Sequence, residues 1–512
     1  MLVKTYGSAV YGINATTITV EVNNTPGAKF SLVGLPDSAI KESQSRIYTA
    51  VKESGCRIPG KSYVINMAPA DIRKEGSSYD LTIAIGILAS TEQVKSDHID
   101  KYVIMGELSL DGSLKPIKGV LPIAIQARKE GFKGLILPLQ NAREAAIVGE
   151  LEILGVETLK DVIEYLNEEK EIQPTIVNTR EEFLANKQPY EADFSDVKGQ
   201  ENIKRAMEIA AAGGHNVIMI GPPGAGKTML AKRLPTILPP MSLHEALETT
   251  KIYSVSGKLG KNASLLSTRP FRSPHHTVSD VALVGGGAVP QPGEISLAHN
   301  GVLFLDELPE YKRQVLEVLR QPLEDRVVTI SRAKFSVEYQ ASFMLVASMN
   351  PCPCGYYNHP DKDCTCSPGI VQKYLSKISG PLLDRIDLHI EVTPVPFKEL
   401  SANRVSEKSE DIRERVVTAR EIQIKRFSDQ TEVHCNAQMV AKQIRAYCQI
   451  DEAGKQLLNT AMERLGLSAR AYDRILKVSR TIADLANSEN IATDHLAEAI
   501  QYRSLDRDGW AG

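Results

Sequence analysis

The sequence predicts an α/β protein whose nucleotide-binding core is built on a parallel sheet, with a helical lid after it and a second α/β domain before it. Three observations predict this architecture. A glycine-rich octapeptide, GPPGAGKT (221–228), lies between an apolar run and a helix-forming run. A second apolar run, GVLFL (301–305), is followed by two acids. Residues 397–512 have the composition and apolar spacing of helices.

The octapeptide has the spacing of a phosphate-binding loop. Glycine recurs in it because successive backbone N–H groups must point at phosphate oxygens, and a Cβ would block that approach. Lys227 is expected to contact the β- and γ-phosphates of ATP, and the Thr228 hydroxyl is expected to bind Mg²⁺. The predicted nucleotide contacts in the loop are Gly221, Pro222, Pro223, Gly224, Ala225, Gly226, Lys227 and Thr228.

Two further strands are expected to end beside this loop. The run GVLFLDEL (301–308) provides Asp306 to hold Mg²⁺ and Glu307 to activate the attacking water as a general base. The run FMLVASMN (343–350) ends in Asn350, which would orient the same water. Because both acids are present, the sequence favours hydrolysis over binding alone.

Composition limits the classes of protein that the chain can belong to. A chain of 512 residues with 42% hydrophobic residues is long enough for about three domains with their own cores. Its formal net charge of −3 gives no overall attraction to nucleic acid, so a DNA contact would need a local basic patch. No apolar run reaches the roughly 18 residues of a membrane span, and residues 1–10 lack the apolar core of a signal peptide. We therefore expect no membrane partner and a cytoplasmic location.

The chain divides into four parts. Strand-like and helical stretches alternate over residues 1–169, which predicts an α/β domain. Residues 170–193 are charged, contain proline and show no sustained periodicity, as is typical of a linker. The nucleotide-binding core is expected at 194–396 and the helical lid at 397–512.

Four of the seven cysteines lie within fifteen residues. Two pairs of thiols at this spacing could surround one tetrahedral Zn²⁺, a metal that thiolates favour. The C-x-C spacing is tighter than the usual C-x-x-C knuckle, so free reduced thiols or a labile disulfide are the alternatives. A bound zinc ion would pin the loop that follows Asn350. The candidate ligands are Cys352, Cys354, Cys364 and Cys366.

Longer motifs surround these residues: RPFRSPHHTVSDVALVGGG (269–287), PGEISLAHNGVLFLDELPE (292–310), LRQPLEDR (319–326), NPCPCG (350–355) and SGPLLDRID (379–387). With them, essentially the whole chain resembles the magnesium-chelatase-like AAA+ family of the ComM/YifB type. The resemblance implies that Arg385 is an arginine finger offered to the γ-phosphate of a neighbouring subunit, within a homo-hexameric ring. An ion pair with Asp384 or Asp387 is the alternative role for this arginine.

The family's second sensor is expected in LSARAYDRILKVSR (467–480). Arg470 and Arg474 lie one turn apart on one helical face and are the favoured nucleotide contacts. Lys477 and Arg480 are the alternatives in another register, and a solvated basic face is the structural alternative for each of them.

Two insertions of this group of motors also have counterparts. RVVTISRAKFSVEY (326–339) reads as a β-hairpin whose tip carries Arg332 and Lys334. If the hairpin points into a central pore, these residues contact DNA phosphates, and an ordinary solvated tip is the alternative. Residues 251–298 would form a helix-2 insert, and its His275 and His276 are not interpreted as metal ligands because no carboxylate or thiol companion is visible nearby.

The amino-terminal region resembles the proteolytic domain of the Lon proteases, a fold of the ribosomal S5 domain 2 type, in residues 68–87 and 106–138. Ser78 matches the nucleophile, but the position of the lysine base falls on Leu121. Lys118 is nearby but is expected to face another way. We therefore expect a non-proteolytic scaffold.

Together these resemblances imply an ATP- and Mg²⁺-dependent ring motor that acts on single-stranded or branched DNA. A helicase or branch-migration translocase that supports DNA integration in natural transformation is the leading hypothesis. The alternative is an ATP-dependent protein remodeller or a chelatase-type motor that acts on a partner protein.

Overall fold

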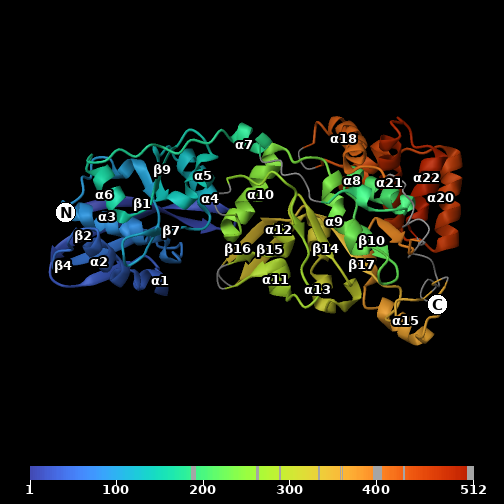
Figure 1. Cartoon of the computed structure of the whole chain (residues 1–512), viewed down its shortest axis with the longest axis horizontal. Helices are drawn as coiled ribbons and strands as arrows, with labels where there is room; N and C mark the ends of the chain where they lie inside the picture. Colours follow the sequence, from blue (N-terminus) through green and yellow to red (C-terminus); the bar gives the residue numbers. More distant parts are fainter. Residues whose placement is uncertain are drawn as a thin grey trace.

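A computed structural model describes residues 1–185, 192–260, 264–287, 290–332, 335–357, 359, 361–395, 406–430 and 433–503. These residues form an elongated molecule with the N-terminal domain at one end, the helical lid at the other and the nucleotide-binding core between them (Figure 1). Within these ranges, no helix combines the length and the apolar character needed to cross a membrane.

The N-terminal domain is built on a mixed sheet. Its strands are β1 (Leu2–Tyr11), β2 (Asn14–Pro26), β3 (Phe30–Val33), β4 (Lys61–Ala68), β5 (Tyr102–Ile104), β8 (Gly134–Pro138) and β9 (Glu152–Val156), and β6 (Glu107–Leu108) pairs separately with β7 (Leu114–Lys115). Its helices are α1 (Ser38–Lys41), α2 (Ser43–Glu53), α3 (Asp80–Ser90), α4 (Val120–Lys129), α5 (Leu139–Ala146) and α6 (Leu159–Leu166). The expected α/β character is confirmed, and α3 is buried along its whole length because it is apolar on every side.

The expected linker contains regular structure. Residues 170–193 include a short helix, α7 (Thr179–Ala185). The Asn178 side chain accepts hydrogen bonds from the backbone N–H groups of Arg180 and Glu181, which starts the helix. Phe183 packs against an apolar cluster between the two domains. Tertiary packing therefore gives this segment a helix that its weak periodicity did not predict.

The nucleotide-binding core has a parallel sheet buried on both faces. Its strands, in spatial order, are β11 (Phe271–Arg272), β14 (Val302–Leu305), β17 (Met344–Met349), β10 (Val217–Ile220) and β18 (Leu388–Glu391), and every pairing is parallel. Its helices are α8 (Glu201–Gly213), α9 (Lys227–Ile237), α10 (Leu243–Ser256), α11 (Asp280–Val284), α12 (Glu294–Leu297), α13 (Arg313–Glu317), α14 (Arg320–Asp325), α15 (Pro368–Leu375) and α16 (Gly380–Leu383). Alternate residues of β10, β14 and β17 enter two separate apolar clusters, one on each face.

The predicted hairpin is confirmed as β15 (Val327–Arg332) and β16 (Phe335–Gln340), paired antiparallel with Arg332 opposite Phe335. Lys334, at its tip, lies outside the described residues. The expected insertion at 251–298 is interrupted by a strand of the core, since β11 pairs with β14 inside the main sheet. A second small hairpin, β12 (Gly285–Gly286) with β13 (Gln291–Pro292), follows it.

The predicted helical lid is also confirmed. Its helices are α18 (Ser409–Arg426), α19 (Ala441–Tyr447), α20 (Glu452–Leu465), α21 (Ala469–Leu485) and α22 (Thr493–Gln501). Apolar residues of α18 and α21 join the cluster of α8 on one face of the core sheet. The lid therefore packs onto the core through the helix that precedes the phosphate-binding loop.

The N-terminal domain contacts the core at two places. The first is between the turn that joins β1 to β2 and the hairpin. A Cβ on Gly12 in this turn would lie 2.7 Å from a methyl carbon of Val337. At the second, the buried Glu144 carboxylate accepts hydrogen bonds from the Leu121 backbone N–H, at 3.1 Å, and from the Ser254 hydroxyl on α10. Burial raises the pKa of Glu144 even though these donors favour its charged form.

Glu144→Ala is expected to loosen the contact between the domains. The substitution leaves the buried Ser254 hydroxyl without its acceptor and the Leu121 N–H with only the longer bond to Ser254 Oγ, at 3.4 Å, which costs about 1–3 kcal/mol in the free energy of unfolding. Urea unfolding and hydrogen exchange of peptides from α4 and α10 measure the two effects. Glu130→Ala, at the exposed end of α4, is the matched control. Unchanged exchange in α10 would show that Glu144 does not hold the domains together.

Candidate active site

The phosphate-binding loop joins the end of β10 to the start of α9. Gly226 caps this helix with a positive φ of 89°, a conformation that favours glycine. A Cβ on Gly221 would lie 2.2 Å from the carbonyl oxygen of Val392, so the backbone of β18's continuation requires glycine there too. The N-terminus of α9 therefore faces the space where the loop would bind phosphate.

Lys227 is a buried cation held by neutral oxygens. Its side-chain nitrogen donates to the carbonyl oxygens of Gly221, at 2.6 Å, and Pro222, at 2.9 Å, and to Asn350 Oδ1, at 3.1 Å. Burial lowers the pKa of Lys227, an effect that the charges of Asp306 and Glu307 oppose. Among the described residues no carboxylate forms an ion pair with Lys227, so a phosphate oxygen fits the chemistry of this site.

The Mg²⁺ residues of the sequence prediction lie together. The Thr228 hydroxyl donates to Asp306 Oδ2 at 2.7 Å, which brings the two expected ligands into contact. The Ser348 hydroxyl donates to Asp306 Oδ1 and orients this carboxylate. Ser348 was missed from the sequence, although it lies in β17 two residues before Asn350, which follows the strand, so strand alternation would place both side chains on the same side.

Glu307 has a strained backbone and an open side chain. Its φ is 52°, in the left-handed region that non-glycine residues rarely adopt, and its side chain is 58% exposed. His276 Nδ1 lies 3.6 Å from Glu307 Oε2, and the ring of His275 lies 4.1 Å from that of His276. The expectation that these histidines lack a carboxylate neighbour was wrong, because β11 and β14 pair in parallel and place both segments at one edge.

Gln200 is a second residue that sequence reasoning missed. It precedes α8 with a φ of 56°, and its side-chain nitrogen donates to the carbonyl oxygens of Ala225 and Thr393, both at 3.0 Å. It therefore links the phosphate-binding loop to the segment after β18. The only signal in the sequence was its place beside Gly199, just before a helix.

Arg385 lies at the opposite edge of the sheet. It precedes β18, which runs parallel to β10, so it is at the amino end of the strands whereas the phosphate-binding loop is at their carboxyl ends. Its guanidinium is buried, forms an ion pair with Glu324 and donates to the carbonyl oxygen of Pro381. Among the described residues, Arg385 pairs with Glu324 and not with Asp384 or Asp387.

Arg470 and Arg474 lie at this same amino edge. Arg474 donates to Asp387 Oδ1 at 3.0 Å, and Arg470 lies 3.6 Å from Asp384. Burial alone would raise the pKa of Asp387, but the charge of Arg474 holds it well below its usual range. Neither arginine approaches the phosphate-binding loop of its own chain, so their role as nucleotide contacts stays a prediction for a neighbouring subunit.

The two alternative cations of the lid, Lys477 and Arg480, form hydrogen bonds with other residues of the lid. Lys477 is buried, donates to the carbonyl oxygen of Ala437 at 3.1 Å, and has its pKa lowered to about 8 by burial and by Arg474. Arg480 donates to Asp484 and to two backbone carbonyl oxygens. Both therefore have structural partners.

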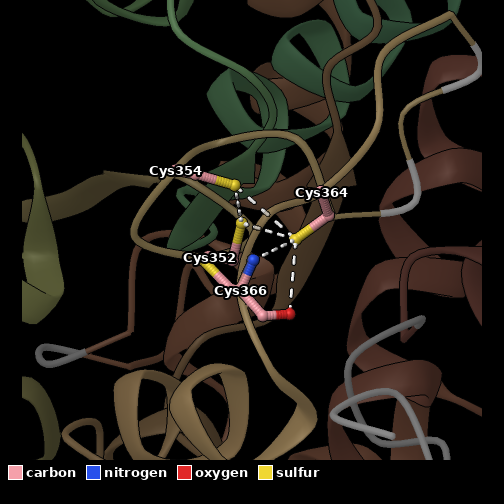
Figure 2. A group of neighbouring side chains, drawn as sticks. All are labelled: Cys352, Cys354, Cys364 and Cys366. Atoms are coloured by element: carbon pink, nitrogen blue, oxygen red, sulfur yellow. Dashed lines mark hydrogen bonds between the residues drawn. The ribbon is translucent and has the colours of Figure 1, made fainter.

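Four cysteine side chains gather on the loop that follows Asn350 (Figure 2). Their sulfur atoms all lie within 4.8 Å of one another, and Cys352 Sγ lies 3.2 Å from Cys354 Sγ and 3.7 Å from Cys364 Sγ. These separations are too long for a disulfide, which needs about 2.0 Å. They are close to the roughly 3.8 Å edge of a tetrahedron with metal–sulfur bonds of about 2.3 Å. The cluster, completed by Cys366, could hold a metal ion.

A backbone donor favours the thiolate form of Cys354, whereas burial and hydrogen bonds with other cysteines raise the pKa of Cys364 and Cys366 despite their backbone donors. The Cys366 N–H donates to Cys364 Sγ at 3.4 Å. A hydrogen bond from the Tyr356 backbone N–H contributes most to lowering the pKa of Cys354, to about 5. Sulfur that already accepts backbone hydrogen bonds as a thiolate is in the form that binds metal.

The protease-like site is incomplete in the structure. Leu121, at the position of the missing lysine, is fully buried in the apolar cluster between the domains. The exposed Lys118 packs its methylene groups near Gly257 of the core, and the buried Lys74 donates to the carbonyl oxygen of Pro69. Within the described residues no hydrogen bond joins either lysine to Ser78, so no amine is placed to activate its hydroxyl.

Glu307→Gln is expected to slow ATP hydrolysis by a factor of about 10²–10⁴, because the amide cannot accept a proton from water. ATP binding should persist, since Lys227 and the loop are unchanged. Steady-state phosphate release and binding of a fluorescent ATP analogue measure the two effects. The control is Glu310→Gln, an exposed acid that pairs with Lys377. A hydrolysis rate within threefold of the unmodified protein would remove Glu307 from the role of base.

Comparison with known proteins places the chain in a family. Residues 193–400 match the family described as magnesium chelatase, subunit ChlI, residues 20–141 match subunit ChlI of Mg-chelatase, and residues 406–503 match its C-terminal part. The competence protein ComM of Haemophilus influenzae is 44% identical over 507 residues, which cover 98% of this chain and 97% of the relative. The YifB protein of Escherichia coli is 43% identical over 504 residues, covering 98% and 96%.

The N-terminal region has a separate relative. Lon protease 2 of Bacillus subtilis is 33% identical over 155 residues, which cover 28% of this chain and 27% of that protein. This match agrees with the α/β fold of the N-terminal domain. The family-model matches and the full-length relatives show that the chain belongs to the magnesium-chelatase-like ComM/YifB family of AAA+ ATPases.

Proposed function

We propose that this protein is a ring-forming motor that hydrolyses ATP with Mg²⁺ and moves along single-stranded or branched DNA in the cytoplasm. One observation carries the proposal. The groups that bind and cleave ATP lie at the carboxyl edge of the core sheet, whereas Arg385, Arg470 and Arg474 gather at its amino edge. A complete site therefore needs the amino edge of a second copy, and repeated head-to-tail contacts of this kind close into a ring.

The ion pair of Arg385 with Glu324 fits this proposal. A buried guanidinium already bonded to a carboxylate and to Pro381 keeps a defined direction. In the ring, the γ-phosphate of ATP bound to the neighbouring subunit would compete with Glu324 for the guanidinium N–H groups of Arg385. The arginines would then stabilise the charge that develops on the transferred phosphoryl group. A homo-hexamer is the ring size that we propose.

The DNA contact is assigned to the hairpin β15–β16. Its base is fixed, because Val337 and Tyr339 are buried and the Tyr339 hydroxyl donates to the carbonyl oxygen of Pro290 at 2.6 Å. The β1–β2 turn of the N-terminal domain also lies against the hairpin, at Gly12 and Val337. A rigid base lets a moving core displace the tip, where Arg332 and Lys334 would contact phosphates without reading bases.

One full-length relative, from Haemophilus influenzae, is named a competence protein. For this chain we propose a role in the integration of incoming DNA by unwinding or branch migration. For the four-cysteine cluster we propose zinc, because four thiolates in a tetrahedral arrangement are typical of structural zinc sites. A protein remodeller that uses the same ATP site is the outcome if DNA has no effect in the experiments below.

Mixing two inactive variants tests the shared site. Lys227→Ala retains Arg385, and Arg385→Ala retains the phosphate-binding loop, so each alone should hydrolyse ATP at least about 100-fold more slowly. In an equimolar mixture about one quarter of the interfaces combine both intact halves, and hydrolysis should rise toward that fraction of the normal rate. Mixing each variant with itself is the control. If the mixture stays as inactive as its components, Arg385 does not act across an interface.

DNA should stimulate ATP hydrolysis, and the hairpin should carry the effect. Arg332→Ala with Lys334→Ala is expected to reduce the DNA-stimulated rate much more than the DNA-free rate, and stimulation should weaken steeply with salt. Phosphate release with and without forked DNA measures this. Lys442→Ala with Arg445→Ala removes the same charges from the exposed face of α19 and serves as the control. Equal stimulation in both double variants would exclude the hairpin.

A further inference from the structure

The four-cysteine loop lies directly against the phosphate-binding loop. Gly355, next to Cys354, has a φ of +87°, and a Cβ placed on it would lie 2.5 Å from the Cδ atom of Pro223. Pro223 is the second proline of GPPGAGKT. The backbone at Gly355 therefore supports the loop that surrounds the phosphates.

The same loop begins at a residue of the active site. Asn350 Oδ1 accepts a hydrogen bond from Lys227, and the Met349 carbonyl oxygen accepts one from the Gly221 N–H at 3.2 Å. The loop thus contacts the nucleotide site twice, through Asn350 where it starts and through Gly355 five residues later.

The described part of this loop has little regular structure of its own. Residues 351–357, 359 and 361–367 include no helix or strand. Cys352 and Gly355 are buried, Cys354, Cys364 and Cys366 are half-buried, and most of the residues between them are exposed. The sulfur atoms from the two ends of the segment converge on one another (Figure 2).

A loop of this kind needs a cross-link to keep one conformation, because ordering its backbone is entropically costly. Four thiolates on a metal ion supply such a link, and the free energy of metal binding then acts as folding free energy.

We propose that one zinc ion, bound by Cys352, Cys354, Cys364 and Cys366, is required for ATP binding because it holds Gly355 against Pro223. This inference rests on the proposed ATPase function of the adjacent site. The zinc ion takes no part in hydrolysis, and its effect reaches the nucleotide through the backbone of the two loops. If its loss leaves about one tenth of the molecules with a competent phosphate-binding loop, the apparent Kd for ATP rises about tenfold.

The first experiment removes the metal. Zinc content is measured by elemental mass spectrometry, and the Kd of a fluorescent ATP analogue is measured on the same full-length preparations. The unmodified protein should hold about one zinc ion per chain. Cys364→Ser should hold less than about half of that and bind the analogue about tenfold more weakly. Cys56→Ser, a half-buried thiol of the N-terminal domain, is the control and should change neither value.

The second experiment separates the contact from the metal. Gly355→Ala should keep about one zinc ion, since all four ligands remain, yet weaken binding of the analogue about tenfold. The reason is that the methyl group has no space beside Pro223 at this φ. Gly369→Ala is the matched control, because a Cβ there would meet no atom within 4 Å. Circular dichroism of each variant verifies that the rest of the chain is folded.

Each result has a distinct meaning. Less than about half a zinc ion per chain in the unmodified protein overturns the metal site. Zinc-free Cys364→Ser that binds the analogue normally overturns the dependence of ATP binding on the metal. Normal binding by Gly355→Ala overturns the route through Pro223. An unmodified, zinc-loaded protein that binds no ATP analogue contradicts the proposed ATPase function itself.

Discussion

The parallel pairing of β17 with both β10 and β14 is the constraint on which the nucleotide site depends. Because the three strands run in one direction, their carboxyl ends bring Lys227, Asp306 and Asn350 to one edge, although these residues are far apart in the chain. A slip of one residue between the strands would turn Ser348 and Asn350 to the other face. Such a slip would also move the apolar side chains of a strand into the opposite cluster, so the packing of the core fixes the register of the site.

The same direction of the strands separates the site from its arginines. β18 runs parallel to β10, and the segment that leads into it must therefore start at the amino edge. Asp387 at that point accepts from the Asn216 backbone N–H at 2.9 Å and from Arg474. One buried carboxylate thus joins the entry to two strands with a helix of the lid. A change in the position of the lid would alter the hydrogen bond between Arg474 and Asp387, two residues after Arg385 in the chain.

Local patterns in the sequence predicted the elements but not their meeting points. The octapeptide, the strand before Asp306, the hairpin and the lid helices follow from spacing over a few residues, and all were found. The proximity of His276 to Glu307 depends on a strand pair, and the place of Arg474 depends on how the lid packs on α8. The hydrogen bond of Ser254 to Glu144 joins residues 110 positions apart. Contacts of this kind are set by tertiary packing, which no local pattern encodes.

The cysteine loop shows a similar division. The sequence indicated a metal site from the spacing of the thiols, and the structure brings the four sulfur atoms together. The contact of Gly355 with Pro223 could not be predicted, because glycine at 355 has several explanations in a loop and only the neighbouring backbone distinguishes them. Gly355 makes room for Pro223 of the phosphate-binding loop.

The burial of Leu121 between the two domains limits which residues can replace it. In the cluster between the domains this side chain is in contact with residues of both, among them Ile147 and Met241. A lysine returned to this position would place an amine among apolar groups, at a cost of several kcal/mol. Recovery of the protease dyad would therefore separate the domain from the core that it now supports. A single substitution at position 121 could therefore not provide a lysine base while this interface stays intact.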